Sequence, residues 1–117
     1  MKILIVDDEK NILKLYKAEL EDEGYTVVTA NSGAEAISIY EQENPDLITL
    51  DIMMPEMDGI QVLRQIKQKR PDIPIIMLTA YDYRDDFSVW VSDAYVVKSS
   101  DLSPLKATIK QILDKKA

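Results

Sequence analysis

The sequence of 117 residues contains no cysteine and no histidine. The lack of cysteine excludes a disulfide framework, a thiolate metal site and a thiol nucleophile. The lack of histidine excludes imidazole acid–base catalysis, a histidine zinc site and a phosphohistidine formed on this chain. Any phosphoryl chemistry must therefore use a different acceptor.

Positive charge is also in short supply. Lysine and arginine number 14 against 21 aspartate and glutamate residues, so the formal net charge is −7. Binding to nucleic acid or to an anionic membrane needs clustered positive charge. We therefore expect this domain to bind neither.

Long apolar runs are missing as well. No stretch approaches the ~20 apolar residues of a membrane span, and the N-terminus lacks the layout of a signal peptide. Together with the missing cysteines, this pattern fits a cytosolic location. The length predicts a single domain that spans residues 1–117.

What the sequence does contain is a regular alternation of short apolar runs and amphipathic stretches. The apolar runs predict five strands, at Lys2–Val6, Tyr25–Ala30, Leu47–Leu50, Ile75–Leu78 and Tyr95–Val97. Amphipathic spacing predicts five helices, at about Glu9–Asp22, after Ser32, after Gly59, around Asp85–Val91 and after Ser103. This alternation with short connections favours an α/β fold, in which a five-stranded parallel sheet carries helices on both faces, doubly wound as (βα)5.

Short motifs mark where some helices should begin and end. Gly24 stands where a C-cap glycine belongs. The run Ser32-Gly33-Ala34-Glu35 matches a capping box. Ser103-Pro104 matches an N-cap followed by proline at the first helical position.

Polar residues stand where four of the predicted strands end. Asp7 and Asp8 follow the first strand, Asp51 the third, Thr79 the fourth and Lys98 the fifth. Taken singly, each has an ordinary structural explanation as a cap or a solvated side chain. In an open parallel sheet, however, the functional crevice lies beyond the carboxyl ends of the strands. Their joint placement at that edge indicates a functional site.

The chemistry of such a site follows from its side chains. Three carboxylates with no thiol or imidazole form a hard oxygen site that suits Mg²⁺ or Mn²⁺. A divalent cation also explains why the apolar strand ends directly in the acidic run Asp7-Asp8-Glu9, whose charges would otherwise repel one another. The lysine and the threonine hydroxyl would then face a small, highly charged anion, and a phosphoryl group fits.

At this point the sequence resembles the response-regulator receiver domain, which has the CheY-like, flavodoxin-like fold. The residues that carry the resemblance are Asp7-Asp8, Asp51 within "LDIMMPEMDG", Thr79 and Lys98, and the resemblance covers the whole chain. It implies a switch of two-component signalling, not an enzyme in the usual sense. Asp51 would accept a phosphoryl group from a sensor histidine kinase or a histidine phosphotransfer protein. The signal would pass to a downstream protein target or output domain, from a single-domain regulator or a phosphorelay intermediate.

The resemblance also implies how the metal is held. Asp8, Asp51 and the backbone carbonyl of Met53 would bind Mg²⁺ directly. Asp7 would contribute mainly through water.

The same resemblance assigns the groups that hold and sense the phosphoryl group. Lys98, Thr79 and the backbone N–H groups of Ile52 and Ala80 would bind its oxygens. On activation Thr79 would move toward it, and Tyr95, three residues before Lys98, would turn inward.

Two further positions would tune hydrolysis of the aspartyl phosphate. They lie two residues past the acceptor and two past the threonine, and here they are Met53 and Tyr81. Neither side chain can position a water molecule as a carboxylate or an amide does. We therefore expect a long-lived phosphoaspartate.

The chain departs from the family pattern in two places. Ser99 follows Lys98 where the family usually has a proline joined by a cis peptide bond, so we expect a trans bond here. The segment between Thr79 and Lys98 is shorter than usual, which predicts a shortened fourth helix.

Three alternatives share parts of this pattern. A phosphatase of the haloacid-dehalogenase type needs a second aspartate two residues after the nucleophile, where this chain has Met53. A flavodoxin-like cofactor binder needs a first loop that cradles a phosphate, and the run of three carboxylates would repel one. A degenerate receiver that only binds protein is disfavoured because all five positions of the pattern are intact.

Overall fold

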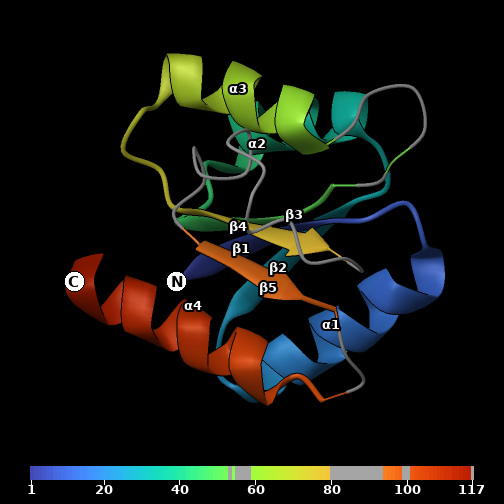
Figure 1. Cartoon of the computed structure of the whole chain (residues 1–117), viewed down its shortest axis with the longest axis vertical. Helices are drawn as coiled ribbons and strands as arrows, with labels where there is room; N and C mark the ends of the chain where they lie inside the picture. The colour runs from blue at the N-terminus through green and yellow to red at the C-terminus, as the bar shows by residue number, and fades with distance from the viewer. Residues whose placement is uncertain (53, 55–58, 80–93, 99–100, 117) are drawn as a thin grey trace.

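The computed structural model describes residues 1–52, 54, 59–79, 94–98 and 101–116 (Figure 1). Five strands form one parallel sheet in the order β2-β1-β3-β4-β5. Their bounds are β1 Lys2–Val6, β2 Thr26–Ala30, β3 Leu47–Asp51, β4 Ile75–Thr79 and β5 Ala94–Val97. The predicted parallel sheet is confirmed, and each strand lies within a residue or two of its predicted position.

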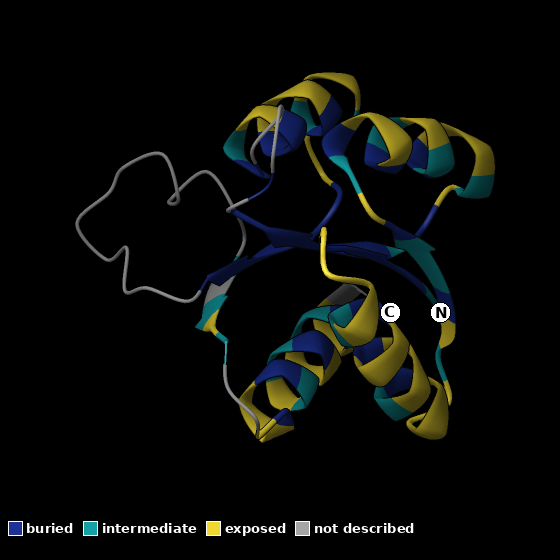
Figure 2. Ribbon diagram, turned by 90° about the vertical axis from the view of Figure 1, so that its right-hand side faces the viewer, coloured by how far each residue is buried: buried dark blue, intermediate teal, exposed yellow. Residues whose placement is uncertain are grey.

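Four helices of the described part cover the two faces of this sheet. They are α1 Lys10–Asp22, α2 Gly33–Glu43, α3 Gly59–Lys69 and α4 Ser103–Lys116. Helices α1 and α4 lie on one face, and α2 and α3 on the other (Figure 2). The helix expected around Asp85–Val91 lies outside the described residues. Among the helices that are described, none has the length and apolar character to cross a membrane.

The sheet is buried on both sides, which is why its strands read as unbroken apolar runs. Alternate residues of each strand belong to two separate cores. Along β3, Ile48 and Leu50 pack toward α2 and α3, whereas Leu47 packs toward α1 and α4. Thr49 and Asp51 alternate with the first pair, so they face α1 and α4 as Leu47 does.

The C-terminal end of α1 has the predicted glycine cap. Gly24 has a φ of 95°, a left-handed value that favours glycine. Its N–H donates to the carbonyl of Glu21 at 3.0 Å, and the N–H of Tyr25 donates to the carbonyl of Leu20 at 3.3 Å. These two bonds form the Schellman pattern that satisfies the last carbonyls of a helix.

Two helix starts differ in detail from the motifs. The hydroxyl of Ser32 accepts from the N–H of Glu35 at 3.1 Å, as predicted, but the Glu35 carboxylate accepts from the N–H of Asn31 and not from that of Ser32. At α4, the prediction of Ser103 as the N-cap is wrong. Ser103 is already helical, and its N–H donates to the side chain of Asp101 at 2.9 Å. A carboxylate two residues earlier thus provides the capping acceptor.

Candidate functional site

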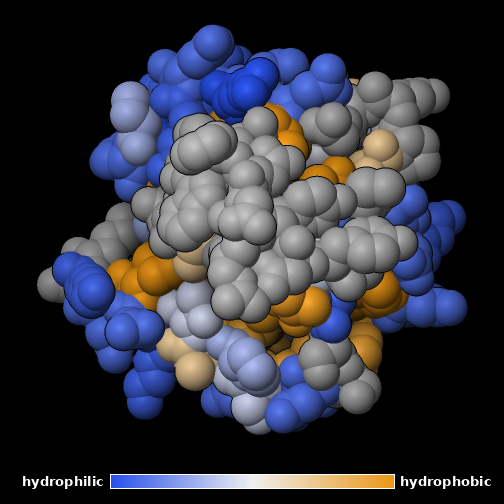
Figure 3. Space-filling model, in the orientation of Figure 1, coloured by the Kyte–Doolittle hydropathy of each residue, from blue (hydrophilic) through white to orange (hydrophobic). Residues whose placement is uncertain are grey.

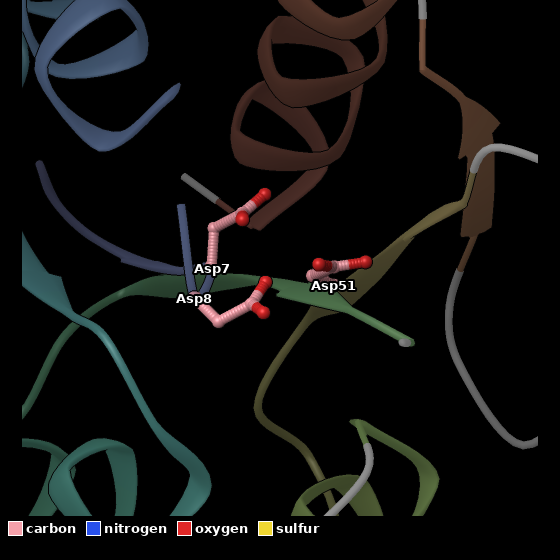
Figure 4. Close-up of side chains that lie close together, drawn as sticks. All are labelled: Asp7, Asp8 and Asp51. Atoms are coloured by element: carbon pink, nitrogen blue, oxygen red, sulfur yellow. The ribbon is translucent and has the colours of Figure 1, made fainter. Parts of the chain in front are cut away.

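The carboxyl ends of β1 and β3 bring three acidic side chains together. Asp7 and Asp8 follow β1, and Asp51 ends its neighbour β3. One oxygen atom from each lies within 4.8 Å of the others (Figure 4). Asp7 and Asp51 are buried and Asp8 is exposed, so the group opens to solvent on the Asp8 side.

Lys98 provides the positive charge that faces these carboxylates. It follows β5, and its ammonium nitrogen lies 2.9 Å from Oδ2 of Asp7 and 3.2 Å from Oδ2 of Asp51. Burial opposes the charged amine, but the hydrogen bond to Asp7 and the charge of Asp51 outweigh burial, so the pKa of Lys98 is raised. The lysine is therefore held in its charged form between two buried acids.

Asp7 is tied on both of its carboxylate oxygens. Oδ2 accepts from Lys98, and Oδ1 accepts from the backbone N–H of Glu9 at 2.9 Å. These two hydrogen bonds use lone pairs that the Asp7 carboxylate would otherwise offer to a cation. The indirect role that the resemblance implies for Asp7 stays a prediction.

The donor set can be tested against a metal ion. All three side chains offer carboxylate oxygens, which Mg²⁺ and Mn²⁺ prefer. Because Mg–O distances are about 2.0–2.1 Å, ligands on opposite sides of one ion lie roughly 4.2 Å apart. A spread of up to 4.8 Å needs a contraction of less than about 1 Å, or one water between an oxygen and the ion. The three carboxylates therefore fit a Mg²⁺ or Mn²⁺ ion.

Thr79 and Ile52 flank this cluster from the ends of β4 and β3. Thr79 is fully buried, and its carbonyl accepts from the backbone N–H of Lys98. The N–H of Ile52 donates to the carbonyl of Leu78 at 3.1 Å. The resemblance implies that the Ile52 N–H binds a phosphoryl oxygen. In the structure this single donor is already bonded to the carbonyl of Leu78 on the neighbouring strand.

Several predicted site features lie outside the described residues. They are the Met53 carbonyl, the Ala80 N–H, the Tyr81 side chain, the Tyr95 side chain and the Lys98–Ser99 bond.

Tyr16 is a neighbour of the site that the sequence pattern did not reveal. It is 4% exposed and lies on the face of α1 that packs against the sheet. Burial raises the pKa of its phenol, Lys98 lowers it, and the charges of Asp7 and Asp51 raise it further, with a net increase. A hydroxyl on an otherwise apolar helix stripe was the available signal, but periodicity alone placed Tyr16 in the core.

Gly59 is a second residue whose contact with the site was missed. Its N–H donates to the carbonyl of Ile52 at 3.0 Å, so α3 begins directly against the end of β3. A Cβ at this position would overlap the carbonyl oxygen of Asp51 and lie 2.9 Å from the carbonyl carbon. The sequence predicted a helix after Gly59, but not this close approach of its first residue to the strand.

Comparison with known sequences agrees with this geometry. The matching family model is described as the response regulator receiver domain, and it matches residues 3–110. The chain is 44% identical over 115 residues to the alkaline phosphatase synthesis transcriptional regulatory protein PhoP of Bacillus subtilis. It is 46% identical over 115 residues to the probable transcriptional regulator ycf27 of Guillardia theta. Each alignment covers 96% of this chain but 48% and 45% of the relatives, so the chain spans about half their length.

Solved structures give the same result for the fold. The response regulator protein TrrA of Thermotoga maritima, crystallised with Mg²⁺-BeF, has a TM-score of 0.90 and 48% identity, with 94% of this chain and 96% of that chain covered. The structure of histidine kinase ThkA in complex with TrrA matches with the same score and identity, covering 96% of this chain and 97% of that chain. A CheY-like receiver domain protein of Methanospirillum hungatei has a TM-score of 0.90 and 37% identity, covering 97% and 94%.

Proposed function

Because this chain belongs to the response regulator receiver domain family, we propose that Asp51 is its phosphoacceptor. A receiver domain of two-component signalling accepts a phosphoryl group and is not an enzyme in the usual sense. The observation that carries the proposal is the setting of Asp51. It is 3% exposed at the end of a central strand, near Asp7 and Asp8, with the Lys98 ammonium 3.2 Å from one of its oxygens.

The transfer step would proceed as a displacement at phosphorus. An oxygen of the Asp51 carboxylate attacks the phosphorus of a phosphohistidine on the donor. The P–N bond breaks, its electron pair stays on the imidazole, and the imidazole takes up a proton. The product is an aspartyl phosphate, an established type of covalent intermediate.

The chain's own residues supply positioning and charge for this step. Burial of Asp51 fixes the attacking oxygen, which is the main requirement of phosphoryl transfer. Lys98 can leave the carboxylate as that group becomes an acyl phosphate and pair with a phosphoryl oxygen instead. Asp8, Asp51 and the Met53 carbonyl would hold Mg²⁺, with Asp7 contributing mainly through water, and the ion would neutralise the negative charge that accumulates there.

Activation and decay of the phosphorylated state complete the proposal. Thr79 and the Ala80 N–H would bind the remaining phosphoryl oxygens, and Thr79 and Tyr95 would rearrange together as the switch. With Met53 and Tyr81 at the hydrolysis-tuning positions, the phosphoaspartate would be long-lived. Phosphate release measured on the phosphorylated chain should be slower than in a Met53→Asn variant, and faster release would contradict this part.

The partners follow from the same chemistry. TrrA has been crystallised with the histidine kinase ThkA, which supports a sensor histidine kinase, or a histidine phosphotransfer protein, as the donor here. The output would be a downstream protein or an output domain, reached through a protein surface that phosphorylation changes. A cytosolic location belongs to this proposal.

Intact-mass measurement tests the proposal directly. Incubation with acetyl phosphate and Mg²⁺ should add one phosphoryl group, and Asp51→Asn should abolish the gain. Asp72→Asn is the matched control, because Asp72 is an exposed aspartate next to β4 but away from the three site carboxylates. Equal labelling of the wild type and Asp51→Asn would reject Asp51 as the acceptor.

A further inference from the structure

The charged residues Asp7, Asp51 and Lys98 face the same side of the sheet. Asp7 follows Ile5 by two residues, and Ile5 packs in the core beneath α1 and α4. Lys98 likewise follows Val96 by two residues, and Val96 packs against that core. Side chains two residues apart along a strand share a face, and Asp51 faces the same two helices. In Figure 4 the Asp7 side chain points to the side of the sheet that carries α1 and α4. What these helices bury on this face therefore determines the surroundings of the charged groups.

Tyr16 is the one buried polar side chain that α1 and α4 bring to this face, within the described part of the chain. It is 4% exposed. The other buried side chains of the two helices are apolar, namely Leu13, Leu20, Leu105, Ile109 and Leu113. Polar side chains otherwise lie on the outer sides of the helices, as the hydrophilic surface over α4 shows (lower left of Figure 3). A phenylalanine would fill the position of Tyr16 without the hydroxyl.

The ring of Tyr16 leans toward the site. Side chains on a helix point back toward its N-terminus, and α1 begins two residues after Asp8, at the carboxyl end of β1. The raised pKa of the phenol agrees with this position. Burial is its largest cause, followed by the charge of Lys98, which lowers the pKa, and by the charges of Asp7 and Asp51, which raise it. Among the charged groups, Lys98 thus has the strongest influence on the hydroxyl.

Lys98 has one more proton than its two partners use. An ammonium group carries three protons. Two of them face Asp7 and Asp51, at N–O distances of 2.9 and 3.2 Å. Within the described ranges, the ammonium has no further partner and the Tyr16 hydroxyl has none. The resting site thus holds a spare donor and a spare acceptor on neighbouring side chains.

Phosphoryl transfer changes the contacts that Lys98 can make. As Asp51 becomes an acyl phosphate, its carboxylate loses its charge and the phosphoryl oxygens become the stronger acceptors. The ammonium then turns from Asp51 to a phosphoryl oxygen. With Asp7 as its only anchor, the ammonium could rotate about its Cε–Nζ bond. A second anchor fixes the direction of the remaining proton, and phosphoryl transfer depends on such positioning.

We propose that Tyr16 is a positioning residue for Lys98, whose hydroxyl accepts one ammonium proton when the lysine turns to the phosphoryl group. This inference rests on the proposed function of Asp51. Asp7 and Tyr16 then hold two of the three protons, and the last one points to a phosphoryl oxygen. Tyr16 touches neither the donor nor the phosphorus and acts through the lysine alone.

Tyr16→Phe tests the hydroxyl, because it keeps the ring and its apolar packing. Tyr40→Phe is the matched control. Tyr40 is 6% exposed on α2 and packs in the core on the other face of the sheet, and its hydroxyl also lacks a partner among the described residues. Both changes remove one phenol oxygen from a buried ring, and thermal unfolding compares their effects on the fold.

Three measurements separate the lysine from the metal site. Intact mass follows the rate of labelling by acetyl phosphate with Mg²⁺. Fluorine-19 nuclear magnetic resonance measures the affinity for beryllofluoride with Mg²⁺, a stable substitute for the phosphoryl group. Electron paramagnetic resonance measures the affinity for Mn²⁺ alone. Tyr16→Phe should lower the labelling rate and the beryllofluoride affinity about tenfold, the scale of one hydrogen bond to a charged group. Its Mn²⁺ affinity should equal that of the wild type, and Tyr40→Phe should change none of the three.

A second pair of variants tests whether the hydroxyl acts through the lysine. Lys98→Met removes the ammonium, so adding Tyr16→Phe to it should cause no further loss of beryllofluoride affinity. Both proteins are compared in excess Mg²⁺, which offsets the missing positive charge.

The inference is overturned if Tyr16→Phe behaves as Tyr40→Phe does, or if it weakens Mn²⁺ binding as much as beryllofluoride binding. It is also overturned if the effect of Tyr16→Phe persists beside Lys98→Met. Where Lys98→Met does not fold, the comparison of Tyr16→Phe with Tyr40→Phe decides alone. Failure of acetyl phosphate to label the wild type, or equal labelling of Asp51→Asn, would instead reject the proposed function.

Discussion

The ammonium nitrogen of Lys98 lies 2.9 Å from Oδ2 of Asp7, a carboxylate that is fully buried. The same nitrogen is 3.2 Å from Asp51. One cation thus bridges two acids that have little access to water. The bridge explains how a strand that ends in carboxylates remains stable before any metal or phosphoryl group arrives.

Removal of this cation should destabilise the chain strongly. We expect Lys98→Met to lower the free energy of unfolding by about 3 kcal/mol, because it removes the ammonium group that pairs with two buried carboxylates. Urea unfolding in the presence of a chelator measures the loss. Added Mg²⁺ should stabilise Lys98→Met more than it stabilises the wild type, since a second cation then replaces the missing charge. Equal stabilisation of both proteins would show that the lysine does not neutralise these acids.

Asp7 and Asp8 should contribute unequally to metal binding. Asp8 is exposed, whereas both oxygens of Asp7 are occupied by Lys98 and by the Glu9 N–H. Asp8→Asn should therefore weaken Mn²⁺ binding by at least about tenfold, the scale of a lost ligand contact, and Asp7→Asn should weaken it less. Electron paramagnetic resonance of free Mn²⁺ during titration gives both affinities. A larger loss in Asp7→Asn would reverse the proposed roles.

Much of this arrangement could be predicted from the sequence because the sheet is buried on both faces. Apolar runs then mark the strands directly, and the carboxyl ends of parallel strands must share one edge. Asp7, Asp51 and Lys98 could be placed together on that ground alone. Their contacts confirm the placement.

The parts that could not be predicted depend on how the elements meet in space. The position of the Tyr16 hydroxyl near the charged cluster depends on how α1 crosses the sheet, which periodicity does not encode. The Ile52 N–H is engaged because it donates to Leu78, the residue of β4 that pairs with Asp51 at the end of β3. The cap of α4 is set by Asp101, since both that residue and Ser103 are good N-cap types and the sequence does not choose between them.

Gly59 offers a test of how closely α3 must approach the acceptor strand. Gly59→Ala should lower the free energy of unfolding by about 1–3 kcal/mol, because the new methyl group overlaps the Asp51 backbone. It should also slow labelling by acetyl phosphate, since Asp51 must shift.

Gly24→Ala is the matched control. Its φ of 95° is unfavourable for alanine, but no atom lies within 4 Å of the added carbon. This control should lose about 1 kcal/mol of stability and keep the wild-type labelling rate. Equal labelling rates in both variants would contradict the close-approach argument.

Two tyrosines with raised pKa values, Tyr16 and Tyr25, should make the chain sensitive to alkali. Burial is the largest cause of the raised pKa of both Tyr16 and Tyr25. A phenol is neutral when protonated, so the folded state holds the proton more tightly than the unfolded chain does. The stability that this provides is fully present below the ordinary tyrosine pKa of about 10, and is lost as pH rises through the raised folded value.

We expect Tyr16→Phe to reduce the fall in unfolding free energy above about pH 10. Tyr25→Phe should reduce it less, because the Tyr25 ring is more exposed. Urea unfolding across that pH range with a chelator present decides this, and an unchanged slope in Tyr16→Phe would refute it.

The buried hydroxyl of Thr49 should lower the stability of the fold, because it lies in an apolar layer. It lies two residues before Asp51 on the same face of β3, paired with Ile5 on β1 and with Ile76 on β4. The residue is fully buried, and its hydroxyl has no hydrogen-bond partner among the described residues. An unpaired buried hydroxyl opposes folding, and valine has nearly the same shape without that group. Thr49→Val should therefore raise the free energy of unfolding, by up to about 1 kcal/mol, in a urea titration without metal. Thr49→Ser is the matched control, because it keeps the hydroxyl but loses a methyl group, and it should be less stable than the wild type. A Thr49→Val protein that is less stable than the wild type would contradict this prediction. It would mean that the Thr49 hydroxyl has a hydrogen-bond partner in the folded protein.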